Sequence, residues 1–150
     1  MNMELREFLV KAKLSTYAGS GEGAERILKG GAKELTYEEG DFKYVDRYFG
    51  FNPFAGEEIV FRNEKAVWAM NYYGRVISGE VSAKKVYGFL KQALRLAGKD
   101  RPFRGPERFR KGDFEYLNEI NGNIKEFSGI ERIIHKGNEA YRLFYHGGRL

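Results

Sequence analysis

The sequence predicts an α+β fold in which two pseudo-twofold-related αβββ repeats form one antiparallel sheet covered by two helices. Three observations predict this fold. Residues 40–75 align with residues 112–148 after one inserted residue, and four glycines recur at matching positions. A helical stripe of apolar residues precedes each stretch, and alternating apolar and polar residues follow it. Because one repeat could not bury the apolar face of its own sheet, we expect residues 1–150 to form a single domain.

Each repeat opens with a predicted helix. Apolar residues recur at i, i+3, i+4 and i+7, a spacing that places them on one helix face. In the first repeat (about 4–77) these residues are Leu5, Phe8, Leu9 and Ala12. In the second repeat (about 82–150) they are Val86, Phe89, Leu90 and Ala93. A loop is expected after each helix, over about 15–40 and about 97–111, because Gly and Pro cluster there, including the glycines within 19–23.

Three strands follow each loop. The first is predicted from alternation with a period of two, which puts on one face Phe42, Tyr44, Asp46 and Tyr48, and in the second repeat Phe114, Tyr116, Asn118 and Ile120. The other two strands form a hairpin in each repeat, 58–62 with 66–73 and 131–135 with 139–145. A short extra strand over 33–37 fits within the first loop.

Composition excludes several classes of protein and several kinds of disulfide or metal site. The chain of 150 residues is long enough for a core, and the absence of Cys excludes disulfides and thiolate metal sites. No apolar run approaches the roughly 20 residues of a membrane span, and residues 1–14 make no signal-peptide core, so a cytoplasmic protein is expected. A single Gln beside many Lys, Arg and Glu is typical of thermophile composition. Neither HExxH nor GxxxxGK[ST] occurs, and no metal or cofactor is implied.

The main functional hypothesis is a cleft between the repeats that binds a small molecule. Acidic residues lie among aromatic ones on the predicted strands, a combination suited to a cationic or polar-aromatic ligand. The candidate residues are Tyr44, Asp46, Tyr48, Glu58, Trp68, Asn71, Tyr72 and Glu131. The alternative for the acids is a structural role at turns or in ion pairs. The first repeat has the richer set, since Asp46 and Tyr48 become Asn118 and Ile120 in the second.

Two further hypotheses concern other classes of function. Residues 84–111 hold ten Lys and Arg against two acids, while the rest of the chain is acidic overall. This segment fits either a solvated surface or a contact with nucleic acid or phosphate, for which the candidates are Arg101, Arg104, Arg108 and Arg110. An enzyme that uses Glu58 or Glu131 as acid or base ranks third, and the sequence favours a binding protein over an enzyme.

Five motifs resemble an uncharacterised domain family of bacteria and archaea, whose members also occur behind Cro/repressor-type helix-turn-helix domains. The motifs are residues 44–50, 54–58, 68–74, 104–106 and 145–148. This resemblance implies a sensor or regulatory role, and it brings no known activity or site residues. The duplicated layout is also similar, at the level of fold alone, to gyrase-inhibitor-like ligand-binding domains, which pair two modules around an acidic and aromatic cleft.

Overall fold

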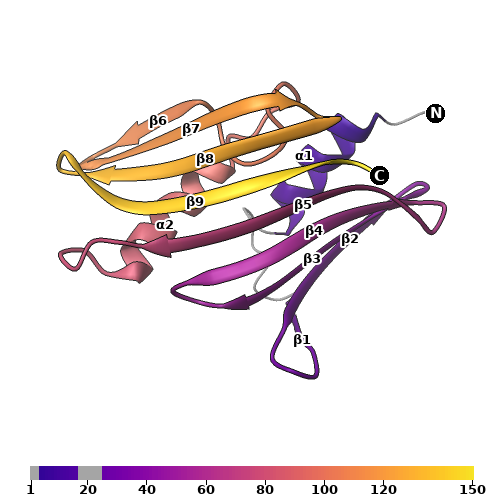
Figure 1. The fold of residues 1–150 in the computed structure, drawn as a ribbon, viewed down its shortest axis with the longest axis horizontal. Coiled ribbons are helices and arrows are strands. Elements are labelled where there is room, and N and C mark those ends of the chain that lie inside the picture. Colours follow the sequence, from indigo (N-terminus) through magenta and orange to yellow (C-terminus); the bar gives the residue numbers. More distant parts are fainter. Residues whose placement is uncertain (1–3, 17–24) are drawn as a thin grey trace.

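One antiparallel sheet of nine strands dominates the computed structural model, which describes residues 4–16 and 25–150 (Figure 1). The strand order is β1-β2-β3-β4-β5-β9-β8-β7-β6. The strands are β1 (Arg26–Ile27), β2 (Lys33–Glu39), β3 (Phe42–Gly50), β4 (Phe54–Arg62), β5 (Lys65–Val76), β6 (Arg108–Lys111), β7 (Phe114–Asn123), β8 (Glu126–His135) and β9 (Asn138–Arg149). Within the described residues there are two α-helices, α1 (Leu5–Ser15) and α2 (Ala83–Leu94).

The predicted fold class was wrong. The chain is mostly sheet with two short helices, and it is not a balanced α+β fold whose sheet is covered by helices. Part of the difference comes from strands near the two ends of the sheet, which lie within the stretches predicted as loops. The extra strand expected over 33–37 is present as β2, and β6 continues the opposite edge. In both strands polar outward residues alternate with inward aromatic or apolar ones, so they add to a sheet edge. The glycines within 19–23 lie outside the described residues.

The two halves of the sheet, β1–β5 and β6–β9, meet at the β5–β9 pair. Tyr72 of β5 lies directly opposite Tyr145 of β9, its counterpart in the aligned sequence. Strand pairing is also equivalent elsewhere, since Asp46 pairs with Glu58 on β3 and β4, and Asn118 pairs with Glu131 on β7 and β8. Polar residues at matching positions therefore face each other across neighbouring strands in both halves.

Both helices lie on one face of the sheet (Figure 1). Helix α1 contacts β2 and β3, where Phe8 stacks on Phe42 with ring centroids 4.9 Å apart. Helix α2 contacts β7, and Phe89 stacks on Phe114 at 5.0 Å. The main core lies between the helices and this inner face. Within the described part of the chain, no helix is both long and apolar enough to cross a membrane.

Candidate functional site

Most of the residues predicted to bind a ligand are buried on the inner face of the sheet. Six of the eight are at most 5% exposed, namely Tyr44, Asp46, Glu58, Trp68, Tyr72 and Glu131. Tyr48 is half-buried at the edge of the same face, whereas Asn71 lies on the outer face between two inward residues of β5. The structure therefore brings seven of the eight to one face.

In the first half, two buried carboxyl groups lie on neighbouring strands, and one of them is bonded to an ammonium group. Asp46 and Glu58 lie opposite each other on β3 and β4. Lys13 of α1 donates a hydrogen bond of 2.8 Å to Glu58 Oε1 and another to the carbonyl oxygen of Phe103. Burial lowers the pKa of Lys13, while Glu58 raises it. Because like charges on neighbouring strands repel each other in a dry site, one cation does not balance both carboxylates.

The pKa of the Asp46 carboxyl group is raised in this arrangement. Burial raises the pKa of Asp46 to about 7, and the negative charge of Glu58 adds to the effect. Tyr72 opposes the rise by donating a hydrogen bond of 2.6 Å to Asp46 Oδ1. Near neutral pH, Asp46 is therefore present in both its protonated and its ionised form.

The second half carries the same cluster with balanced charge. Arg104 donates two hydrogen bonds to Glu131, of 2.8 and 3.1 Å, and the hydroxyl groups of Tyr116 and Tyr141 donate to the same carboxylate. Asn118 replaces the second carboxyl group and accepts a bond of 2.6 Å from Tyr145. Glu58 and Glu131 thus each have their own cation, rather than facing each other across an open cleft.

Glycines on the strands next to these tyrosines make the clusters possible. Gly56 pairs with Tyr72, and a Cβ atom at position 56 would lie 2.5 Å from the Tyr72 hydroxyl oxygen. The tyrosine ring can lie over β4 and reach Asp46 on β3 only because position 56 has no side chain. Gly129 stands in the same relation to Tyr145. These glycines explain why the repeat retains Gly at this position.

A pocket of about 560 Å³ opens between α2 and the first half of the sheet, and we call it the helix–sheet pocket. Its aromatic walls are Tyr48, Phe51, Phe54, Tyr72 and Tyr87. Its charged residues are Glu25, Lys33, Lys84 and Lys91, and the remaining lining residues are Thr16, Leu35, Gly50, Gly88 and Leu90. Tyr72 connects this pocket to the buried cluster, because its hydroxyl group bonds to Asp46.

Gly88 is the feature of the pocket that packing does not explain. It lies in the interior of α2, where Gly costs about 1 kcal/mol relative to Ala. No atom lies within 4 Å of the position that a Cβ atom would take there, so no neighbour requires a glycine. Its effect is to leave the α2 backbone open toward the pocket.

In the second half, an aromatic side chain covers the equivalent sheet position. Phe127, the counterpart of Phe54, packs on Phe103 with ring centroids 4.3 Å apart. Phe103 belongs to the segment between α2 and β6, which folds back over the inner face and also supplies Arg104. The two halves therefore differ in what covers their sheets, and the first half retains the space.

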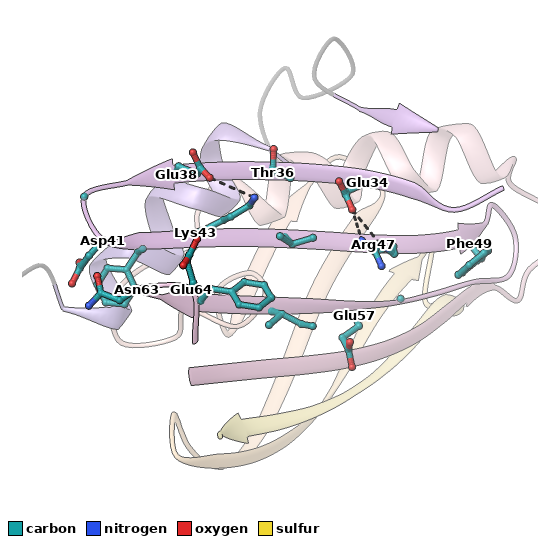
Figure 2. A pocket seen from close by; sticks show the side chains of 16 residues that line it. Glu34, Thr36, Glu38, Asp41, Lys43, Arg47, Phe49, Glu57, Asn63 and Glu64 are labelled. Atoms are coloured by element: carbon teal, nitrogen blue, oxygen red, sulfur yellow. Dashed lines mark hydrogen bonds and ion pairs between the residues drawn. The ribbon is translucent and has the colours of Figure 1, made fainter. Parts of the chain in front are cut away.

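A larger hollow of about 960 Å³ lies on the outer face over β2, β3 and β4, and Figure 2 shows it from close by. Its charged side chains largely pair with one another: Arg47 contacts Glu34 at 2.6 Å, and Lys43 contacts Glu38 at 3.5 Å. It is an open surface along neighbouring strands, rather than a space between the sheet and a helix. We therefore regard the helix–sheet pocket as the candidate site.

The arginines proposed to contact nucleic acid all have partners within the chain. Arg104 is 2% exposed and bonded to Glu131, so it cannot reach a phosphate group. Arg108 and Arg110 both contact Glu115, and Arg101 donates to the carbonyl oxygen of Asn118. The basic segment thus serves in part to balance buried and surface carboxylates.

Sequence reasoning missed several residues of the site. Lys13 is the most informative, because a lysine four residues after Leu9 falls on the apolar stripe of the first helix, and that position signals a buried ion pair. Gly88 could have been noticed as a glycine inside a helical pattern. Lys33, Lys84 and Tyr87 carry no comparable local signal, because their place at the pocket depends on how α2 crosses the sheet.

The comparison with family models finds a match over residues 46–150 to a family described as a domain of unknown function (DUF5680). The matched region begins inside β3 and includes α2 and both hairpins, and thus most residues of the helix–sheet pocket and the buried clusters. Neither the comparison with curated proteins nor that with solved structures gives a match.

Proposed function

The chain belongs to the DUF5680 family of domains of unknown function, and we propose that it binds a small, largely apolar molecule in the helix–sheet pocket. The volume of about 560 Å³ is within the range of pockets that hold small organic ligands. A pocket of this kind has apolar walls with a few polar groups that set orientation, and the aromatic walls and the lysines at this site fit that description.

The arrangement of the aromatic walls supports a ligand with a flat face. Phe54 lies 5.9 Å from Tyr72 and 5.7 Å from Tyr87, measured between ring centroids. Tyr72 is on β5 and Tyr87 is on α2, so the three rings connect the sheet to the helix around the pocket. A planar molecule can stack on such rings or meet their edges, and each aromatic contact contributes roughly 0.5–1.5 kcal/mol beyond area burial.

Gly88 is the single observation that carries the proposal. A helix-interior glycine with open space beside it has a cost in stability and no compensating contact within the described residues. Close approach of a ligand to the helix backbone would account for it. The family resemblance suggests that this binding serves a sensor or regulatory role. Glu58 and Glu131, the proposed acid or base residues of an enzyme, do not line the pocket, and no catalytic group is assigned to it.

The test uses N-phenyl-1-naphthylamine, an uncharged aromatic probe whose fluorescence rises in apolar pockets. We expect saturable binding to the wild-type protein and its loss in Gly88→Leu, which fills the pocket. The matched control is Gly79→Leu, because Gly79 is also exposed, has no atom within 4 Å of its Cβ position and lies outside the pocket. Equal binding by wild type and Gly88→Leu, or no binding by wild type, would refute the proposal.

A further inference from the structure

The charges around the helix–sheet pocket are mostly positive. Lys33 comes from β2, and Lys84 and Lys91 come from α2, whereas Glu25 is the one acidic residue among the described lining residues. Glu25 accepts a hydrogen bond of 2.5 Å from the Tyr48 hydroxyl group. The lining therefore has two more positive than negative charges around walls that are otherwise aromatic.

The lysines of α2 are placed symmetrically about the opening at Gly88. Lys84 precedes Gly88 by four residues and Lys91 follows it by three, so all three share one helix face. Lys33 lies on the opposite side of the pocket, with its ammonium nitrogen 5.7 Å from the centre of the Tyr48 ring. A molecule seated against Gly88 would have an ammonium group one helical turn away on either side.

Lys33 and Lys84 have no carboxylate partner among the described residues. The surface lysines Lys11, Lys43 and Lys99, by contrast, are each paired with a glutamate. The nearby carboxyl groups also have other partners: Glu58 is bonded to Lys13, and Asp46 accepts a hydrogen bond from Tyr72. Positive charge at the pocket is thus not balanced by the buried cluster.

We infer that the ligand of the helix–sheet pocket is a planar aromatic molecule bearing an anionic group, such as a carboxylate, sulfonate or phosphate. This inference rests on the proposed function and adds the chemical class of the ligand. The aromatic walls bind the ring system, and the lysines bind the anionic group through charge-assisted hydrogen bonds. A cationic ligand, which the acidic residues in the sequence had suggested, would meet three like charges at the opening.

The experiment compares two probes that differ by one charged group, 8-anilino-1-naphthalenesulfonate and the uncharged N-phenyl-1-naphthylamine. At low salt we expect the wild-type protein to bind the sulfonate roughly fivefold more tightly, because one partly exposed ion pair contributes up to about 1 kcal/mol. The difference should shrink as the salt concentration rises, since salt screens exposed charges.

Substitution of adjacent lysines locates the effect. Lys84→Met should remove most of the preference for the sulfonate, measured as the ratio of the affinities for the two probes. Lys85→Met is the matched control, because Lys85 is also exposed and does not line the pocket. Equal affinity for the two probes, or equal effects of the two substitutions, would overturn the anionic class alone. Failure of both probes to bind would overturn the pocket itself.

Discussion

Asp46 and Asn118 occupy equivalent positions in the two halves, and each accepts a hydrogen bond of 2.6 Å from a tyrosine two strands away. An asparagine is a permanently neutral counterpart of a protonated aspartic acid. The side chain at this position is therefore always neutral in the second half, whereas in the first half it is neutral only when Asp46 is protonated. This relation leads directly to a prediction for the first half.

Asp46→Asn should stabilise the protein at alkaline pH and change its pH dependence. The pKa of Asp46 is about 7 in the folded chain, above the ordinary value of 3.8, so its contribution to stability is present at low pH and is lost as pH rises through 7. The advantage of the variant in unfolding free energy should grow by at most about 1.4 kcal/mol per pH unit between pH 4 and 7 and then level off. Urea titrations at several pH values measure it.

The control for this experiment is Asp41→Asn on the surface. Arg62 lowers the pKa of Asp41 by a hydrogen bond, so the contribution of Asp41 is lost as pH falls, which is the opposite sign. An advantage of Asp46→Asn that stayed constant from pH 4 to 8 would contradict the raised pKa of Asp46.

Lys13→Met should strongly destabilise the fold. Removing the ammonium group leaves Glu58 buried beside Asp46 with no cation, and loss of one partner of a buried pair costs about 3–5 kcal/mol. Lys11→Met, two residues earlier on the same helix, removes an exposed contact with Glu39 and should change the unfolding midpoint little. Chemical denaturation of both variants makes the comparison, and similar effects at the two positions would argue against the buried cluster.

Gly88→Ala should raise the unfolding free energy by about 0.5–1 kcal/mol, because Ala favours the helix and the added methyl group meets no atom. Gly56→Ala should lower it by about 1–3 kcal/mol, because its Cβ atom would collide with Tyr72. Thermal and urea unfolding distinguish the two glycines. A destabilised Gly88→Ala variant would show that Gly88 has a structural role, and the argument for the pocket would lose its main support.

Arg104→Met should behave as a core substitution, with a loss of about 3–5 kcal/mol from the unpaired Glu131. Arg108→Met removes a side chain that is 64% exposed and should have little effect on stability. If the basic segment instead bound nucleic acid, Arg108→Met would weaken salt-sensitive binding to a DNA or RNA oligonucleotide. We expect no such binding by the wild-type protein in an anisotropy titration.

Local patterns in the sequence predicted the inner-face residues of β3 and the two hairpins, because alternation with a period of two is decided by which face is buried. They also allowed a short strand within β2, but they did not predict β6, since the outward residues of an edge strand are as polar as those of a loop. Trp68, predicted to bind the ligand, is fully buried and stacks on Phe127, so it lies in the core and does not line the pocket.

The predicted site was placed on the correct face of the sheet, but its chemistry was incomplete. Asp46 and Tyr72 were singled out as acid and aromatic residues, whereas the cation that partners the acids comes from α1 and the pocket wall comes from α2. Contacts between a helix and a distant strand depend on tertiary packing. The spacing of residues within one element can indicate that a charged side chain is buried, as at Lys13, but it does not identify the strand that supplies the partner.

The most direct test of the account is a ¹⁵N–¹H NMR titration of the protein with 8-anilino-1-naphthalenesulfonate. Binding in the helix–sheet pocket should give the largest shifts on the backbone amides of Gly88 and Tyr72, which lie on opposite walls of this pocket. The outer-face residues Phe49 and Tyr73 should change little. Shifts concentrated on the outer face, with Gly88 and Tyr72 unchanged, would contradict it.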